Sequence, residues 1–212
     1  MLFGSISYLN LLPFQLFLKR HLKSTSAKLA FRYKRAVPSQ INRSLKRREI
    51  NAAFISSVES RKCTCTDLGI IAYQKVYSVL LLEGKDQNDP ASATSNHLAK
   101  ILHLHGKVLI GDAALKYYLE GGEGIDLSEA WYEKTGLPFV FARLCYNQQG
   151  KTVKKLAKTF TRTQPKIPQY ILKKEAKKRG ITPKQLTWYL AQIYYTMGHK
   201  EKRSLKKFLS AS

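Results

Sequence analysis

The stretch GSISYLNLLPF, residues 4–14, decides how this chain begins to fold. Its apolar residues predict a strand over residues 2–7, and Pro13 is typical of the first turn of a helix, which we expect at residues 12–22. The turn between them leaves Asn10 and free backbone N–H groups at the carboxyl end of a strand. Ligands bind at that edge of open α/β sheets, and helix N-termini there favour anions. The opening segment therefore predicts a ligand site at Asn10.

Strands and helices alternate along the first two thirds of the chain. Apolar and alternating runs predict strands at residues 28–33, 52–55, 69–73, 76–82, 107–110 and 139–146. Helices are expected at residues 37–46, 92–102, 112–120 and 127–134, with Gly136 as a C-cap of the last. After residue 150 the pattern is wholly helical, with helices expected at 151–162, 168–179, 183–197 and 200–209. This order is typical of an α/β fold with a helical C-terminal region.

The size and composition of the chain predict a protein with a packed core. The chain has 212 residues and is 44% apolar, enough for one domain or two small lobes. No apolar run is long enough to cross a membrane, so no membrane partner is expected. The first residues lack the basic start of a secretory signal, and Asn10 and Pro13 interrupt their apolar stretch. We therefore expect a cytoplasmic location.

The positive charge is concentrated in the last third of the chain. The formal net charge is +23, and residues 151–212 hold 17 of the 37 basic residues but only two of the 14 acidic ones. Such a tail would suit nucleic acid or an anionic surface. Residues 173–195 even resemble a helix-turn-helix joint, but they carry an apolar stripe that more often marks core: Leu186, Leu190, Ile193 and Tyr194. We favour solvated Lys-rich helix faces, so nucleic acid is not the expected partner.

The cysteines and histidines show no spacing typical of a disulfide framework or a metal site. Cys63 and Cys65 form one C-x-C pair, and Cys145 stands alone. We expect three reduced thiols, as in a reducing compartment. His103 and His105 could share one face of a strand, but no third ligand is evident. No metal is therefore expected.

Three segments together resemble one enzyme family. The N-terminal SYLN-x-x-P, the central IGDAAL and the later DLSEAWYEKTGLPFVFA occur in the order found in the chorismate dehydratases of the futalosine route to menaquinone. The resemblance runs over most of the chain, and the last two motifs are long and specific. It implies the two-lobed fold of type II periplasmic binding proteins, with the ligand in the cleft between the lobes.

The same resemblance implies how the chain is divided between the lobes. Lobe one would hold residues 1–83 and 138–212, and lobe two would hold residues 84–137. The hinge strands would be residues 76–82 and 139–146. Only residues 103–106 separate the predicted helix at 92–102 from the next strand, where family members usually have a longer segment. The second lobe is therefore expected to be trimmed.

The reaction implied by the resemblance is the loss of water from chorismate, without a cofactor. A proton leaves the ring carbon that bears the enolpyruvyl ether, and the neighbouring hydroxyl departs. The family places a functional Asn at Asn10 and an active-site Ser at Ser78. The Asn10 amide can donate to a leaving hydroxyl or a carboxylate, although it could also simply stabilise its own turn. Ser78 would hydrogen bond to the substrate, unless it is an ordinary strand serine.

Six further residues are candidates for substrate binding. Four hydroxyl residues sit at predicted helix starts, where they could receive a carboxylate or serve as plain N-caps: Ser56, Ser57, Thr94 and Ser95. Gly111 would let the backbone approach the ligand closely. Asp112 is interpreted as a capping and hinge residue, with general base as the alternative.

No Glu or His stands where a general base is needed, so the enolpyruvyl carboxylate of the substrate is a candidate proton acceptor. Two other functions remain open. One is a non-catalytic small-anion-binding protein of the same fold, and the other is a nucleic-acid module. Assembly into a homodimer is also left open.

Overall fold

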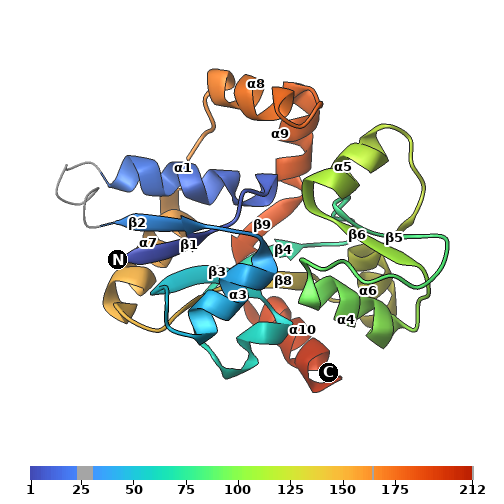
Figure 1. The fold of residues 1–212 in the computed structure, drawn as a ribbon, viewed down its shortest axis with the longest axis horizontal. Coiled ribbons are helices and arrows are strands. Elements are labelled where there is room, and N and C mark those ends of the chain that lie inside the picture. The colour runs from blue at the N-terminus through green and yellow to red at the C-terminus, as the bar shows by residue number, and fades with distance from the viewer. Residues whose placement is uncertain (23–30, 164, 212) are drawn as a thin grey trace.

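The computed structural model describes residues 1–22, 31–163 and 165–211, which form two β-sheets surrounded by helices (Figure 1). The larger sheet has six strands in the order β2-β1-β3-β8-β4-β9. The smaller sheet has three strands in the order β6-β5-β7. Figure 1 shows the small sheet with its helices at one side of the molecule, and the first and last thirds of the chain at the other. The expected α/β fold with two parts is confirmed.

The six-stranded sheet is built from both ends of the chain and from its middle. Its strands are β1 (Leu2–Ser5), β2 (Arg32–Arg35), β3 (Ala52–Ser56), β4 (Thr64–Ala72), β8 (Phe139–Tyr146) and β9 (Ile193–Thr196). Strand β1 runs parallel to β2 and β3, whereas β8 is antiparallel to β3 and β4. Every residue of β3 is buried. A side chain at Gly4 would meet Ile41 and Ile50, so this glycine lets the neighbouring helix lie close to β1.

The three-stranded sheet and its helices form a compact second unit. The strands are β5 (Val79–Leu82), β6 (Lys107–Ile110) and β7 (Ile125–Asp126), and both outer strands pair antiparallel with β5. Three helices belong to this unit: α4 (Ala93–Leu102), α5 (Gly111–Leu119) and α6 (Leu127–Thr135). The chain enters it through residues 73–78 and leaves it through residues 136–138.

The remaining helices accompany the large sheet. They are the 3-10 helix η1 (Leu9–Leu11), α1 (Leu12–His21), α3 (Pro38–Lys46), the 3-10 helix η2 (Val58–Lys62), α7 (Gly150–Thr163), α8 (Gln169–Lys177), α9 (Pro183–Ala191) and α10 (His199–Ser210). Helix α9 begins where the sequence predicts, because Thr182 accepts from the Gln185 N–H and Gln185 accepts from the Thr182 N–H. Helix α6 ends at Gly136, which is left-handed as expected.

The expected helix over residues 183–197 is wrong in its second half. Helix α9 stops at Ala191, and residues 193–196 form β9 on the edge of the large sheet beside β4. The segment Ile193-Tyr-Tyr-Thr196 consists of β-branched and aromatic residues, which pack well on a sheet. The apolar stripe is core as expected, since Leu186 and Ile193 are buried.

Several predicted strands differ from the structure in their bounds. The strand expected at residues 69–73 is the second half of β4, which already begins at Thr64. The strand expected at residues 76–82 begins only at Val79, because Tyr77 has a left-handed backbone with φ of 62°. Strand β5 also pairs within the small sheet, so the proposed boundary after residue 83 would fall before β5 instead. Of the strand expected at residues 28–33, residues 28–30 lie outside the described part of the chain.

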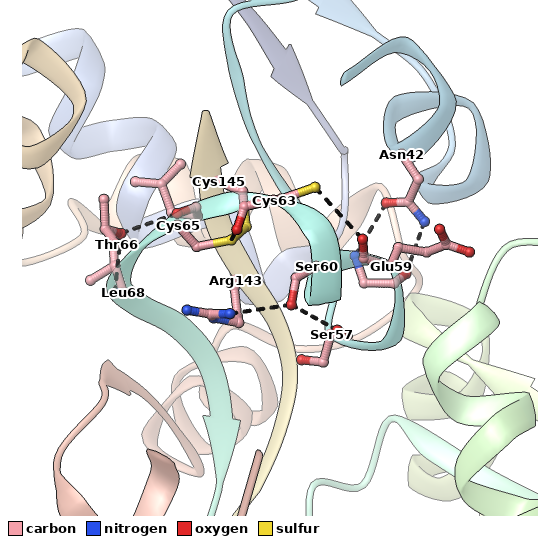
Figure 2. The surroundings of a disulfide bond; sticks show 12 residues. Asn42, Ser57, Glu59, Ser60, Cys63, Cys65, Thr66, Leu68, Arg143 and Cys145 are labelled. Atoms are coloured by element: carbon pink, nitrogen blue, oxygen red, sulfur yellow. Dashed lines mark hydrogen bonds between the residues drawn. A yellow bond between two sulfur atoms is a disulfide. The ribbon is translucent and has the colours of Figure 1, made fainter. Parts of the chain in front are cut away.

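The expectation of three free thiols is wrong for two of the cysteines. Cys65 on β4 and Cys145 on β8 form a disulfide, and Cys63 stays free (Figure 2). The two bonded cysteines stand opposite each other in the antiparallel register of these strands. No local pattern of the sequence indicates this pairing, because the two cysteines are 80 positions apart. Near the disulfide, the Arg143 guanidinium donates to the Ser60 hydroxyl at 3.4 Å (Figure 2).

None of the helices in the described residues is both long and apolar enough to cross a membrane.

Candidate functional site

A small cavity lies where the two sheets meet. Its volume is about 70 Å³, well below the roughly 300–1,000 Å³ of typical ligand pockets. Its polar wall is formed by Tyr8, Asn10, Ser56, Ser78, Ser92, Ser95 and Gly111. Its apolar wall is formed by Ile6, Leu11, Pro38, Phe54, Ile55, Ile70, Val76, Val79, Ile110, Phe141 and Ala142. The large sheet with its helices, here called the first unit, and the second unit both contribute residues to these walls. A change in the distance between the two units would therefore change the size of the cavity.

Asn10 lies in η1, directly after β1, and faces this cavity. Its backbone carbonyl accepts from the hydroxyl of Tyr195 at 2.7 Å, which fixes the turn. Its Oδ1 atom is buried and has no hydrogen-bond partner among the described residues. A buried amide oxygen without a partner is costly in a folded protein, so it marks a place where a ligand can bind.

Ser78 lies across the cavity from the first unit, just before β5, and only 2% of it is exposed. Its Oγ accepts from the hydroxyl of Tyr189 at 2.9 Å. Its backbone carbonyl accepts from the N–H of Gly111 at 2.8 Å. The left-handed Tyr77 turns the chain so that Ser78 meets both partners.

Asp126 holds the backbone of the turn before Ser78. Its Oδ2 accepts from the N–H groups of Val76 and Tyr77 at 2.9 and 2.7 Å. Its Oδ1 accepts from the N–H groups of Ser128 and Glu129, so the same carboxylate caps α6. Burial raises the pKa of Asp126, and these four N–H groups oppose that increase. One side chain thus joins the DLSEAWYEK motif to the position of Ser78.

Gly111 allows a close contact between the two units. Its φ is 68°, and a side chain there would meet the ring of Tyr8 at 2.8 Å. Tyr8 therefore packs directly on the first residue of α5 and closes one side of the cavity. Burial raises the pKa of Tyr8 to about 12, and Asp89 and Asp112 add to the increase. Tyr8 is thus a neutral hydrogen-bonding group at ordinary pH.

The N-terminus of α4 also reaches the cavity. Ser92 caps this helix by accepting from the Ser95 N–H at 3.1 Å, and its hydroxyl donates to the Ser95 hydroxyl at 2.7 Å. First-turn N–H groups of a helix lack partners within the helix and attract anions. Ser56 lies on the opposite wall, where its Oγ accepts from the side-chain amide of Asn42 at 3.1 Å.

Three of the predicted site residues do not line the cavity. Ser57 is fully buried and donates to the carbonyl of Val140 at 2.6 Å. Thr94 accepts from the N–H of Val58 at 3.3 Å. Asp112 does not cap α5, since no side chain caps that helix. Each of the three joins elements of the two units or supports a strand, whereas Asn10 and Ser78 share the cavity as expected.

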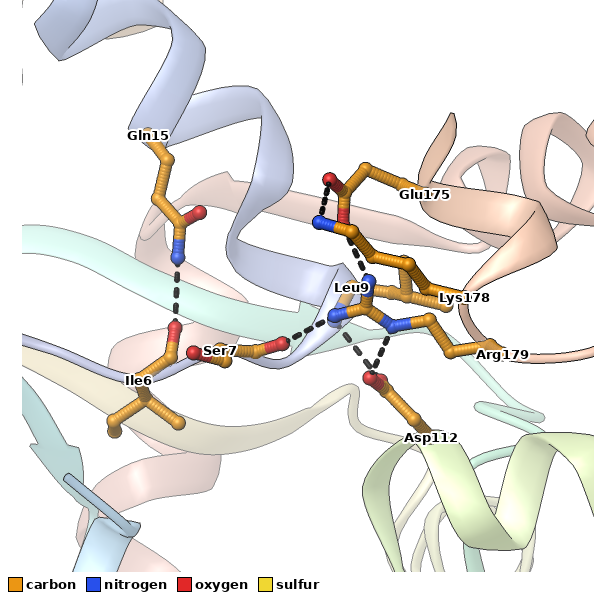
Figure 3. A network of polar contacts seen from close by, with 8 residues as sticks. All are labelled: Ile6, Ser7, Leu9, Gln15, Asp112, Glu175, Lys178 and Arg179. Atoms are coloured by element: carbon orange, nitrogen blue, oxygen red, sulfur yellow. Dashed lines mark hydrogen bonds and ion pairs between the residues drawn. The ribbon is translucent and has the colours of Figure 1, made fainter. Parts of the chain in front are cut away.

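Asp112 instead belongs to a polar network between the two units (Figure 3). Its Oδ1 accepts from the N–H of Leu9 at 3.0 Å, and its Oδ2 accepts from the Arg179 Nε at 2.8 Å. Arg179 also donates to the Ser7 carbonyl at 2.7 Å and pairs with Glu175 on α8. Figure 3 shows this guanidinium between the N-terminal turn, α8 and α5. The network connects the units beside the cavity.

We expect Asp112→Asn to raise the KM for substrate about 5- to 20-fold while changing kcat less than about threefold. The variant loses an ion pair between the units worth about 1–2 kcal/mol, so the closed form becomes harder to reach. Steady-state kinetics measures both constants. Glu120→Gln is the control, because it removes an ion pair with Lys116 inside α5 alone. A lower KM in Asp112→Asn would indicate that the carboxylate faces an anionic substrate instead.

The walls of the cavity have a distinctive chemistry. None of its lining residues in the described chain is Lys, Arg, His, Asp or Glu. Hydroxyls, one amide, backbone groups and the start of α4 are the polar groups available to a ligand. No cluster of three or more His, Cys, Asp or Glu side chains suited to a metal ion occurs in the described ranges.

Two residues of the site could not be identified from the sequence. Tyr189 lies in a predicted helix between Leu186 and Leu190 of the apolar stripe, a position that gives no sign of a polar role. Asp126 opens the specific DLSEAWYEK motif, and an Asp before a helix is a capping signal. That signal identifies the cap but not its contact with residues 76 and 77, which lie 50 and 49 positions earlier.

The chain is similar to known proteins over its whole length. A family described as menaquinone biosynthesis matches residues 1–107 and 103–212. A chorismate dehydratase of Campylobacter jejuni subsp. jejuni serotype O:23/36 (strain 81-176) is 47% identical over 216 residues, covering 100% of this chain and 97% of the relative. A chorismate dehydratase of Thermus thermophilus is 25% identical over 261 residues, covering 98% of this chain and 93% of the relative.

Solved structures agree on the fold. A protein from Archaeoglobus fulgidus superposes with a TM-score of 0.68 at 12% identity, covering 99% of this chain and 95% of that one. The periplasmic aliphatic sulphonate binding protein SsuA from Escherichia coli superposes with a TM-score of 0.57 at 12% identity, covering 99% and 85%. The periplasmic-binding-protein-like fold is therefore confirmed. With the match along its full length, the chain belongs to the menaquinone biosynthesis family that includes the chorismate dehydratases.

Proposed function

We propose that this chain is a hydro-lyase that converts chorismate to 3-[(1-carboxyvinyl)oxy]benzoate, the first step of the futalosine route to menaquinone. The observation that supports it best is the shared cavity of Asn10 and Ser78, in a chain 47% identical to a chorismate dehydratase. The proposal includes a cytoplasmic location and no cofactor.

The substrate carries two carboxylates, and the cavity wall offers neutral donors for them. The Ser95 hydroxyl and the first turn of α4 are available as donors, and so is the Ser56 hydroxyl, whereas the Ser92 proton is already donated to Ser95. Charge-assisted hydrogen bonds from such groups are stronger than neutral ones. The strongly basic surface would raise the local concentration of a dianion before it binds.

Asn10 and Ser78 would act on the leaving hydroxyl of the ring. Both are neutral donors, and Asn10 also has an acceptor oxygen without a partner among the described residues. Neither can take the ring proton, because amides and serine hydroxyls are weak bases. With no carboxylate or imidazole in the described cavity wall, the enolpyruvyl carboxylate of the substrate is the available acceptor. The carboxylate then passes this proton to the departing hydroxyl, which leaves as water, and the ring becomes aromatic.

At about 70 Å³ the cavity is too small for such a substrate. We propose that the second unit, which comprises β5, β6 and β7 with α4, α5 and α6, moves against the rest of the chain to admit it. Residues 73–78 and 136–138, which join the sheets, are the segments that would bend. The network of Asp112 with Leu9 and Arg179 would form again on closure.

The experiment is direct. Purified protein is incubated with chorismate without added metal or cofactor, and the aromatic ultraviolet band and the product mass are followed. Formation of the benzoate ether supports the proposal. Saturable binding of chorismate without any product would favour the second candidate, a small-anion-binding protein of this fold. If the protein instead bound DNA with an affinity that falls steeply as the salt concentration rises, a nucleic-acid module would be favoured.

We expect kcat for this dehydration to vary less than about threefold between about pH 6 and pH 10. The reason is that no group in the described cavity wall titrates there, since the pKa of Tyr8 is about 12 and Tyr8 stays neutral below it. Initial rates at saturating chorismate across this range check it. A bell-shaped profile would point to a general acid or base of the protein and contradict the use of the substrate carboxylate.

A further inference from the structure

Tyr189 is a buried tyrosine that contacts Ser78 of the site. No motif of the sequence explains its position. It lies on α9, only 1% of it is exposed, and its hydroxyl donates to the Ser78 Oγ at 2.9 Å. The two residues are 111 positions apart, and Ser78 lies in the segment that leads into the second unit. Buried tyrosine hydroxyls require a partner, and Ser78 is the one the structure provides.

This hydrogen bond restricts the proton of Ser78. A serine hydroxyl has one proton and two acceptor lone pairs, and it rotates to suit its surroundings. Because the Tyr189 proton occupies one lone pair, the Ser78 proton is directed away from Tyr189. Ser78 lines the cavity, so its proton is free to point into that space. The Ser78 hydroxyl is thereby prepared to donate into the cavity.

Tyr189 remains a donor under all ordinary conditions. Burial raises its pKa far above the usual range of a phenol, and the nearby Ser78 hydroxyl and Asn10 amide lower it only in part. Tyr189 thus stays a neutral donor to the Ser78 hydroxyl.

We propose that Tyr189 is a positioning residue for the dehydration, which orients the Ser78 hydroxyl so that its proton points at the departing oxygen of the ring. The inference rests on the proposed function and adds a residue to it. Neither Tyr189 nor Ser78 gains or loses a proton in the step. The ring proton leaves with the hydroxyl as water, and Ser78 stabilises the negative charge that develops on that oxygen.

Tyr189→Phe tests this role, because it removes one hydroxyl and keeps the ring. We expect kcat to fall about 10- to 100-fold and KM to change less than about threefold, since the oriented proton matters most when the oxygen departs. The decisive measurement is a double-mutant cycle with Ser78→Ala. In the Ser78→Ala background, Tyr189→Phe should change kcat less than about twofold. Equal losses in both backgrounds would overturn the role through Ser78.

Tyr195→Phe is the matched control. Tyr195 is equally buried and donates to the backbone carbonyl of Asn10 rather than to Ser78. Its effect on kcat should therefore be the same with Ser78 or Ala at position 78. Coupling with Ser78→Ala as large as that of Tyr189→Phe would show a general loss of packing and contradict the proposal.

A second substitution separates the donor from the ring and covers the case in which the Phe variant does not fold. Tyr189→4-aminophenylalanine restores an N–H donor at the para position and should recover at least about a third of the wild-type kcat. A folded but inactive aminophenylalanine variant, or a fully active Phe variant, overturns the inference while wild-type turnover still supports the lyase. Absence of product with the wild-type protein overturns both.

Discussion

Asn10→Asp and Ser78→Ala are each expected to lower kcat for chorismate dehydration about 100-fold or more in a protein that remains folded. Asn10→Asp replaces the amide donor with a carboxylate in a cavity that has no Lys or Arg in its described wall. That charge would face a doubly negative substrate without a partner, which is unfavourable. Ser78→Ala removes the hydroxyl that would stabilise the departing oxygen, and the loss of one such donor typically costs a factor of about 100–1,000.

The measurement is steady-state turnover of chorismate, with circular dichroism and thermal unfolding to show that each variant is folded. Ser44→Ala is the control, because Ser44 is also a buried serine but donates to Glu49 outside the cavity. Its kcat should stay within about twofold of the wild-type value. Normal activity in both site variants would show that Asn10 and Ser78 have no catalytic role. The membership of the chain in the family would be unaffected.

Asp126→Ala is expected to lower the free energy of unfolding by about 3–5 kcal/mol, the largest effect on stability that we predict. Its carboxylate accepts from four backbone N–H groups, of Val76, Tyr77, Ser128 and Glu129. Each buried N–H left without a partner costs about 1–3 kcal/mol, and part of that cost is relieved by water. Because Tyr77 leads into Ser78, kcat should fall as well.

Urea denaturation measures the free energy, and an unchanged slope with denaturant would show that the same cooperative unit unfolds. Asp126→Asn should lie between wild type and Ala, since it keeps one acceptor oxygen. Thr182→Ala is the matched control, because Thr182 caps α9 through the Gln185 N–H without contacting the turn before Ser78. We expect it to cost about 1 kcal/mol with normal kcat. Equal losses of unfolding free energy in Asp126→Ala and Thr182→Ala would indicate that Asp126 acts only as a helix cap.

Local patterns of the sequence predicted most helices and strands of this protein. Strands β6 and β8 have the expected bounds, and α1, α3, α4 and α6 agree with the expectation within about one residue at each end. The Thr182–Pro183 start of α9 and the Gly136 end of α6 are as predicted. These signals work because hydrophobic period, capping residues and turn residues act within a few positions of the chain.

The resemblance to the family directed attention to Asn10 and Ser78, and local signals to Ser56, Ser95 and Gly111. The fold places all five around one cavity. Whether they act in catalysis stays a prediction. The local pattern predicted a capping and hinge role for Asp112, with general base as the alternative, because an Asp after a strand is typical of a helix start. Its actual partner, Arg179, is 67 residues away and could not be seen in the local pattern.

The sequence by itself determined the periodic elements, their caps, the family and the turn that carries Asn10. Only the tertiary structure decided that residues 193–196 form an edge strand, that Cys65 meets Cys145, and that Tyr189 donates to Ser78. These contacts join residues 80 to more than 100 positions apart, or depend on a sheet that must already exist to be extended. The physical reason is that such pairings arise from how layers pack, and packing overrides the local preference of short segments.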